Sequence, residues 1–187
     1  MIDSALEHLT SALEATMSES RHVMEQIATA IVGCIKDGGK VLLCGNGGSA
    51  ADCQHVAAEF VNRFRLERSP LPAIALTTDT SILTSIANDY SFDQVFSKQV
   101  RSIGVKGDVL IGISTSGRSK NVLMALDVAK EMGLVTVGFT GNDPREMEHK
   151  CDLLLRVASK DTPRIQEIHI FCAHLVCDLV ERSMFGK

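Results

Sequence analysis

The residues from 114 to 119 are the part of the sequence best suited to hold an anion. They read Ser114, Thr115, Ser116, Gly117, Arg118 and Ser119, so four hydroxyl groups stand beside a flexible glycine. An apolar run precedes them and a helical pattern follows, which places them at a helix N-terminus, where free N–H groups stabilise an anion. Capping that helix needs only one hydroxyl, so we predict a phosphate-binding loop. A Walker A lysine motif and a GxGxxG pattern are both missing from it, which disfavours a nucleoside triphosphate or a dinucleotide.

Two pairs of side chains elsewhere are suited to acid–base or metal chemistry. His55 and Glu59 stand four residues apart on an expected helix and therefore share a face. Gln166 and His174 stand eight residues apart on the last expected helix, about 80° from alignment, so both can point toward one cleft. A His–Glu pair alone is more often a surface ion pair. The second pair carries more weight, because its helix is apolar nearly all round, and buried polar groups need partners.

Short apolar strands alternate with helical segments after Gly39, and these elements must position the candidate residues. We expect an α/β fold with a five-stranded parallel sheet flanked by helices, because the strands are apolar on both faces. The expected strands are residues 40–44, 72–76, 108–113, 134–139 and 153–157. The expected helices are residues 50–66, 80–87, 92–103, 119–132 and 162–184. A glycine-rich loop, residues 45–49, and the loop at 112–119 then both lie at carboxyl ends of strands, where such sheets bind ligands.

The first 38 residues have a different character. Apolar residues recur there at helical spacing, which predicts one or two helices ending near Gly38 and Gly39. A long apolar stripe outside the α/β core indicates a surface for self-association. We therefore expect a single domain over residues 1–187, with residues 1–38 as an oligomerisation element and residues 39–187 as the core.

Composition excludes several classes of protein. A chain of 187 residues with 45% hydrophobic and 22% charged residues is ordinary for one globular domain. The net charge of −4 argues against a nucleic-acid or membrane-surface partner, which needs a basic face. We find neither a signal peptide nor an apolar run near the ~20 residues that span a bilayer. Six scattered cysteines without a CxxC pair favour reduced thiols in the cytoplasm.

Four blocks together resemble the SIS (sugar isomerase) domain, and specifically the phosphoheptose isomerases. They are residues 44–49, 87–89, 109–119 and 164–169. The resemblance implies a flavodoxin-like fold and a homotetramer with sites shared between subunits. It also implies conversion of sedoheptulose 7-phosphate to D-glycero-D-manno-heptose 7-phosphate through an enediol, the first step toward ADP-heptose.

The resemblance assigns roles to individual residues. Glu59 would be the base and His174 the acid, and Zn²⁺ would be held by His55, Glu59, Gln166 and His174. The substrate would contact Asn46, Gly47, Gly48, Ser49, Arg63, Asn88, Asp89, Ser114, Thr115, Ser116, Ser119 and Gln166. His169 faces away from His174 and is expected to be structural.

Two departures and several alternatives stay open at this level. Arg118 stands where the family typically has Asn. Pro163 stands where an acidic residue often precedes Arg164, and Asp161, two positions upstream, is the candidate substitute. The main alternative is a non-catalytic SIS protein of the replication-initiator-associating type, but such proteins tend to lack the acid–base pair. A DNA-binding sugar sensor needs a further domain, and a pentose or hexose phosphate as substrate is not excluded by sequence.

Overall fold

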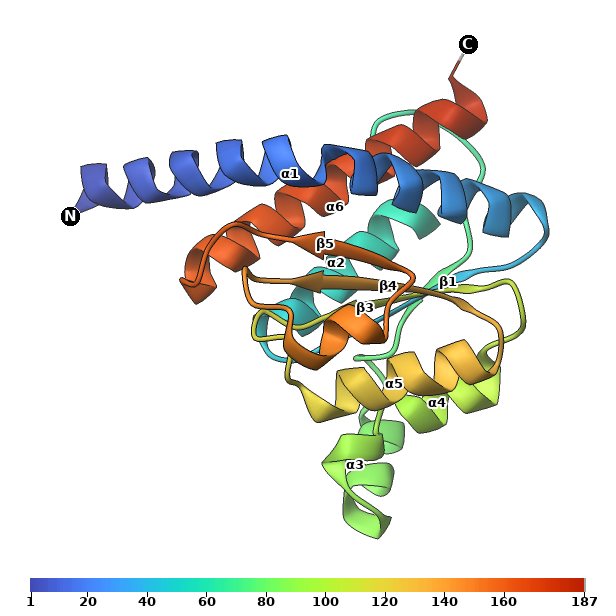
Figure 1. Ribbon diagram of the computed structural model, residues 1–187. Coiled ribbons are helices and arrows are strands. Elements are labelled where there is room, and N and C mark those ends of the chain that lie inside the picture. The colour runs from blue at the N-terminus through green and yellow to red at the C-terminus, as the bar shows by residue number, and fades with distance from the viewer. Residues whose placement is uncertain (187) are drawn as a thin grey trace.

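Five parallel strands form the centre of the molecule, in the order β2-β1-β3-β4-β5 (Figure 1). The computed structural model describes residues 1–186. The strands are β1 (Val41–Gly45), β2 (Ala73–Ala75), β3 (Val109–Ile113), β4 (Val135–Thr140) and β5 (Leu153–Arg156). Strands β1 and β3 are buried along their whole length, which explains their continuous apolar sequence. The expected five-stranded parallel sheet is confirmed.

Helices cover both faces of this sheet. One face carries α1 (Ile2–Lys36), α2 (Gly48–Val61) and α6 (Thr162–Phe185), and the other carries α4 (Ser97–Ile103) and α5 (Lys120–Glu131) (Figure 1). The remaining helices are α3 (Thr80–Asp89), η1 (Phe92–Gln94) and η2 (Arg145–His149), and α3 packs against η1. A hydrophobic core lies on each side of the sheet. One includes Phe60 of α2 and Phe139 of β4, and the other includes Leu110 of β3 and Leu126 of α5.

The strand order places a topological switch at β1. The chain leaves β1 for β2 on one side and β3 lies on the other, so the loops after β1 and β3 diverge at a shared edge. The side chains of Asn46 and Asn121 exchange two amide hydrogen bonds of 2.9 and 2.8 Å across this point. The glycine-rich loop is therefore tied to the first turn of α5, directly after the loop at 112–119.

Two helix boundaries differ from the sequence prediction. The helix expected over residues 50–66 ends at Val61, because the next backbone groups bond to the side chains of Arg68 and Glu181 instead of continuing the helix. The helix expected over residues 92–103 is divided into η1 and α4. The N-terminal segment, in contrast, is one continuous helix of 35 residues.

Several apolar side chains of the two long helices face solvent. Met1, Ile2 and Leu6 are exposed in the first turns of α1, which extend beyond the rest of the fold (Figure 1). Phe171 and Leu179 of α6 are 41% and 37% exposed, so the prediction of a largely buried last helix was wrong for this face. Within the described part of the chain, no helix has the length and apolar character needed to cross a bilayer. The cysteines are all free, and all but Cys151 are buried.

Candidate active site

The serine loop (residues 114–119) joins the end of β3 to α5. Ser114 is buried, and its hydroxyl lies 2.9 Å from that of Ser119, which closes the loop on itself. Gly117 has a φ of +64°, and a Cβ at this position would collide with the backbone of Pro144. Glycine is therefore required twice here, for its conformation and for close packing against the segment after β4. The Gly141 N–H donates to the Thr115 carbonyl at 3.1 Å and holds that segment in place.

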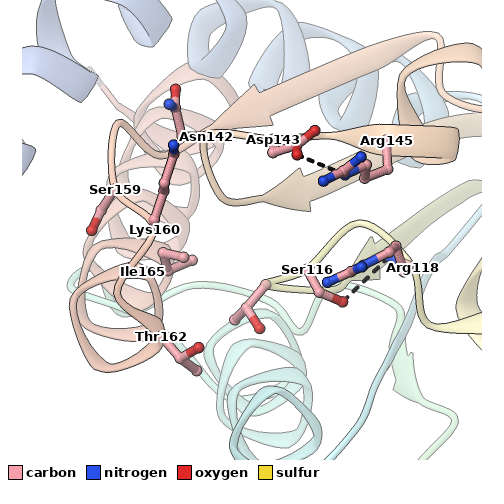
Figure 2. Close-up of a pocket in the computed structure, with 10 residues that line it drawn as sticks. Ser116, Arg118, Asn142, Asp143, Arg145, Ser159, Lys160, Thr162 and Ile165 are labelled. Carbon is pink, nitrogen blue, oxygen red and sulfur yellow. Dashed lines mark hydrogen bonds and ion pairs between the residues drawn. The ribbon is translucent and has the colours of Figure 1, made fainter.

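A cavity of about 340 Å³ opens beside the serine loop (Figure 2). Its lining comes from the loops after β3, β4 and β5 and from the start of α6: Thr115, Ser116, Arg118, Asn142, Asp143, Arg145, Ser159, Lys160, Thr162 and Ile165. We call it the serine-loop pocket. The last seven of these residues were missed at the sequence level. Their position after strands β4 and β5, at the same sheet edge as the serine loop, was the signal that could have found them.

The charges around the serine-loop pocket favour an anion. Arg118, Arg145 and Lys160 line it, and the acidic lining residue Asp143 is neutralised by an ion pair with Arg145 at 2.6 Å (Figure 2). Arg118 is exposed to solvent and also lines the pocket, so its guanidinium can contact both water and a bound anion. The cavity is thus electropositive, polar and large enough for a phosphate group.

His55, Glu59 and His174 come together between α2 and α6, and we call them the His–Glu–His cluster. One ligand atom from each lies within 4.8 Å of the others. His55 Nε2 is 3.0 Å from a Glu59 carboxylate oxygen and 3.4 Å from His174 Nε2. The His55 side chain is 49% exposed, so a ligand can reach the cluster from solvent. The ring of Phe64 lies 5.3 Å from that of His174.

The electrostatics of the His–Glu–His cluster favour a neutral His174. Burial lowers the pKa of His174, the nearby His55 lowers it further, and Glu59 opposes both effects only partly. A neutral imidazole is the form that binds a metal ion. Two imidazole nitrogens and one carboxylate facing the same point are a donor set that suits Zn²⁺ with positions left for substrate.

Gln166 of α6, the fourth predicted ligand, packs its side chain against the start of α2. A Cβ added to Gly48 would come within 2.5 Å of Gln166 Nε2, so the Gln166 amide lies directly against the backbone at the start of α2. Gln166 stands on α6 between Thr162 and Ile165 at the serine-loop pocket and His174 in the His–Glu–His cluster. The helix α6 therefore connects the two regions.

Of the remaining predicted contacts, Ser49 is buried, whereas Arg63, Asn88 and Asp89 are exposed. The Nη1 atom of Arg63 lies 3.7 Å from a carboxylate oxygen of Glu67. Asn88 donates to Asp89 at 2.8 Å in the last turn of α3, which packs on η1 and not on α2 or α6. Within one chain, the fold does not bring Asn88 and Asp89 to the His–Glu–His cluster.

The histidine and proline noted on α6 have structural roles. His169 is 1% exposed and donates from Nε2 to the Thr140 carbonyl at 3.1 Å, as expected for a structural histidine. Burial lowers its pKa to about 4, although the Thr140 hydrogen bond acts in the opposite direction. Pro163 occupies the first turn of α6, where a missing N–H costs nothing. Asp161 is the N-cap residue of this helix, without a side-chain capping bond.

Comparisons with known proteins agree with this geometry. The SIS domain family model matches residues 6–141. The phosphoheptose isomerase of Burkholderia pseudomallei is 54% identical, over 100% of this chain and 95% of that protein. The chain belongs to the phosphoheptose isomerase family. The family name denotes an aldose–ketose isomerase, which favours the enzyme over the non-catalytic alternative.

Solved structures of phosphoheptose isomerases have the same fold over nearly their whole length. The structure from Neisseria gonorrhoeae has a TM-score of 0.91 and 43% identity, and covers 96% of each chain. The structure from Francisella tularensis has a TM-score of 0.94 and 38% identity, covering 97% of this chain and 96% of that one. The long α1 and the five-stranded sheet are thus features of the family fold.

Proposed function

We propose that this phosphoheptose isomerase converts sedoheptulose 7-phosphate to D-glycero-D-manno-heptose 7-phosphate, the first step toward ADP-heptose. The observation that carries the proposal is the convergence of His55, Glu59 and His174 from two helices. A protein that only binds a sugar phosphate has no need for a base and an acid beside each other. The names of the full-length relatives support the seven-carbon substrate.

The reaction moves one proton between neighbouring carbons. In the ketose, Glu59 removes a proton from C1, the carbon next to the C2 carbonyl. The protonated form of His174, which is a stronger acid because its pKa is lowered, protonates the carbonyl oxygen and leaves an enediol. Glu59 then returns the proton to C2, and the C1 hydroxyl gives its proton to His174 to form the aldehyde, which restores both groups. No group leaves, and no electron acceptor is required.

The phosphate of the substrate binds at the serine loop in this proposal. N–H groups and hydroxyls at the start of α5 stabilise the dianion, and the electropositive serine-loop pocket adds to this attraction. The contacts are assigned to Asn46, Gly47, Gly48, Ser49, Ser114, Thr115, Ser116, Ser119 and Gln166. The carbon chain extends along α2 and α6 toward the His–Glu–His cluster, since side chains on both helices tilt toward their N-termini and so toward the loops.

Zn²⁺ is the cofactor that the donor set favours. His55, Glu59, Gln166 and His174 would hold it, and when bound it would act as a Lewis acid on the substrate oxygens. Glu59 has two carboxylate oxygens, so one is free to move the proton while the other is a ligand.

We also propose that the enzyme is a cytoplasmic homotetramer. The exposed apolar residues of α1 and α6 supply self-association surfaces, and the free, buried cysteines suit a reducing compartment. Residues 1–38 serve as the oligomerisation element. Because α3 lies on the other face of the sheet, Asn88 and Asp89 would contact substrate in a neighbouring subunit, and Arg63 would line the same site. Light scattering during gel filtration tests this, and a monomer at micromolar concentration would contradict it.

A direct assay tests the activity. The protein is incubated with sedoheptulose 7-phosphate, and the aldose is detected by ¹H NMR. We expect product, loss of most turnover after chelation, and recovery on adding Zn²⁺ alone. Full activity in the chelated, metal-free protein would remove zinc from the mechanism, and no aldose from any preparation would refute the proposed function.

A further inference from the structure

Glu181 on α6 is a buried carboxylate that no step of the proposed reaction uses. Its residue is 1% exposed, and its two oxygens accept hydrogen bonds from three successive backbone N–H groups: Phe64 at 3.1 Å, Arg65 at 2.8 Å and Leu66 at 2.8 Å. Burial alone raises the pKa of this carboxyl, but these bonds and the one from Arg68 outweigh it and hold the pKa below its usual range. Glu181 is therefore an ionised group that fixes the backbone just after α2.

Arg68 completes the arrangement from the other side. Its side chain is 2% exposed, and Nε donates to Glu181 at 3.1 Å. Nη2 donates to the Glu59 carbonyl at 2.7 Å, and Nη1 donates to the Phe60 carbonyl at 2.6 Å. These carbonyls belong to the last turn of α2, which has no further helix to bond to. One guanidinium thus ties the end of α2 to a carboxylate on α6.

The Arg68–Glu181 pair borders the His–Glu–His cluster on both helices. Glu59 supplies a cluster side chain and, through its own carbonyl, a bond to Arg68. Phe64, whose N–H bonds to Glu181, places its ring against His174. Glu181 stands seven residues after His174, nearly two full turns, so both project from the same face of α6. The segment between α2 and β2 runs beside the C-terminal half of α6 (Figure 1).

Stability alone does not explain an ion pair in this position. A buried pair loses so much hydration that apolar residues of similar volume often stabilise a fold equally well or better. What the pair provides instead is a fixed geometry. Arg68 donates from Nε, Nη1 and Nη2 and Glu181 accepts from four donors, which restricts the attached backbone to one arrangement.

We propose that Arg68 and Glu181 are positioning residues for the His–Glu–His cluster: they set the distance and orientation of Glu59 and Phe64 relative to His174. The proposal rests on the proposed function for its catalytic consequence, but its structural consequence is independent of it. Neither residue touches substrate. Both act by holding the end of α2 against α6.

The test compares Glu181→Gln with the wild-type protein. Each carboxylate oxygen accepts two hydrogen bonds, so the amide places an NH₂ donor against two N–H donors wherever it turns. We expect amide hydrogen exchange at residues 64–66 to accelerate at least tenfold. We also expect the dissociation constant for Zn²⁺, measured by competition with a chromophoric chelator, to rise tenfold or more. The kcat should fall at least tenfold while the KM for the sugar phosphate stays within about twofold.

Asp108→Asn is the matched control. Asp108 is also fully buried and ionic, and accepts the backbone N–H groups of Lys40 and Val105 and the ammonium of Lys40. These partners lie outside α2, α6 and the segment that joins α2 to β2. Asp108→Asn should therefore lower the Tm, yet retain wild-type Zn²⁺ affinity and kcat below its melting range. Where Glu181→Gln does not fold, Arg68→Lys takes its place. Lysine keeps the positive charge but has one nitrogen in place of the three that donate in Arg68.

Equal effects of the two variants on Zn²⁺ affinity and kcat would overturn the proposal, since they would then reflect lost stability. Unchanged Zn²⁺ affinity and kcat in a folded Glu181→Gln protein would overturn it as well. Failure of the proposed function looks different: the wild type would not isomerise the sugar, and exchange and Zn²⁺ binding would still decide the role of the pair.

Discussion

The serine-loop pocket and the His–Glu–His cluster are formed by different structural elements. The pocket is made by loops after β3, β4 and β5, with closely packed backbone such as Gly117 against Pro144. The cluster is made by side chains from two helices, and two of these side chains, His55 and His174, are 119 residues apart in the sequence. A backbone-built pocket can hold a phosphate on many sugars, whereas the cluster decides the chemistry. Anchoring and reaction should therefore be separable by mutation.

Glu59→Gln should have the largest effect. The amide keeps the size of the side chain but cannot accept a proton, so we expect kcat to fall by about 10²–10⁴-fold, the usual contribution of a general base. Steady-state kinetics with sedoheptulose 7-phosphate measure this. Glu131→Gln on the exposed end of α5 is the control and should be unaffected. A near-normal kcat in the Glu59→Gln enzyme would contradict the assignment of the reaction to the His–Glu–His cluster.

Ser116→Ala should act on the other region. Ser116 lines the serine-loop pocket, and a hydrogen bond to a charged group contributes about 1.5–3 kcal/mol, equivalent to a rise in KM of roughly 10- to 100-fold. The kcat should change little, because the hydroxyl is outside the His–Glu–His cluster. Ser102→Ala on α4, where the side chain is exposed, is the matched control. If kcat fell instead and KM did not change, the loop would not be an anchor.

Arg118→Asn should have a smaller effect on the same parameter. Arg118 is exposed, and exposed ion pairs contribute about 0.2–1 kcal/mol, so KM should rise by no more than about fivefold. The difference from the wild type should shrink as salt is added, since screening weakens exposed charges. An Arg118→Asn KM equal to that of the wild type at every salt concentration would show that this side chain serves solvent contact alone.

His169→Gln should change stability and leave kinetics at pH 7.5 unchanged. The folded pKa of about 4 lies below the ordinary 6.5, so the unfolded chain binds a proton first as pH falls. The wild type should lose up to about 3 kcal/mol of unfolding free energy between pH 6.5 and 4, and have its full stability above 6.5. Urea titrations across this range measure the slope. His169→Gln should flatten it relative to the exposed control His22→Gln, and an unaltered slope would contradict a buried, neutral His169.

The sequence was informative where the signal is local. Residues 114–119 carry hydroxyls, a glycine and a strand–helix boundary within one window, and the structure places them at the edge of the sheet as predicted. The strands were found because a strand buried on both faces reads as an uninterrupted apolar run. The pair His55 and Glu59 was visible from spacing, but its junction with His174 needed the packing of α6 on α2, and family resemblance supplied it.

Other features depend on contacts that no short window contains. The end of α2 was overestimated by five residues, because Arg68 and Glu181 capture backbone groups that a helical pattern would have used. Arg145 and Lys160 join the serine-loop pocket only because β4 and β5 end at the same edge as β3. The exposure of Phe171 was missed because apolar residues all round a helix predict burial. The pattern does not show whether this chain or another copy of it covers each face.

The central claim is that the serine loop anchors the substrate and the His–Glu–His cluster carries out the reaction. Binding of sedoheptulose 7-phosphate to the inactive Glu59→Gln protein tests this claim most directly. Isothermal titration gives its Kd, and the same titration is made with the Glu59→Gln, Ser116→Ala double variant. We predict that Glu59→Gln binds the sugar phosphate with a Kd within about threefold of the wild-type KM. We also predict that adding Ser116→Ala weakens binding at least tenfold. Loss of binding in Glu59→Gln alone, or equal Kd values for the two variants, would contradict a serine loop that anchors and a cluster that reacts.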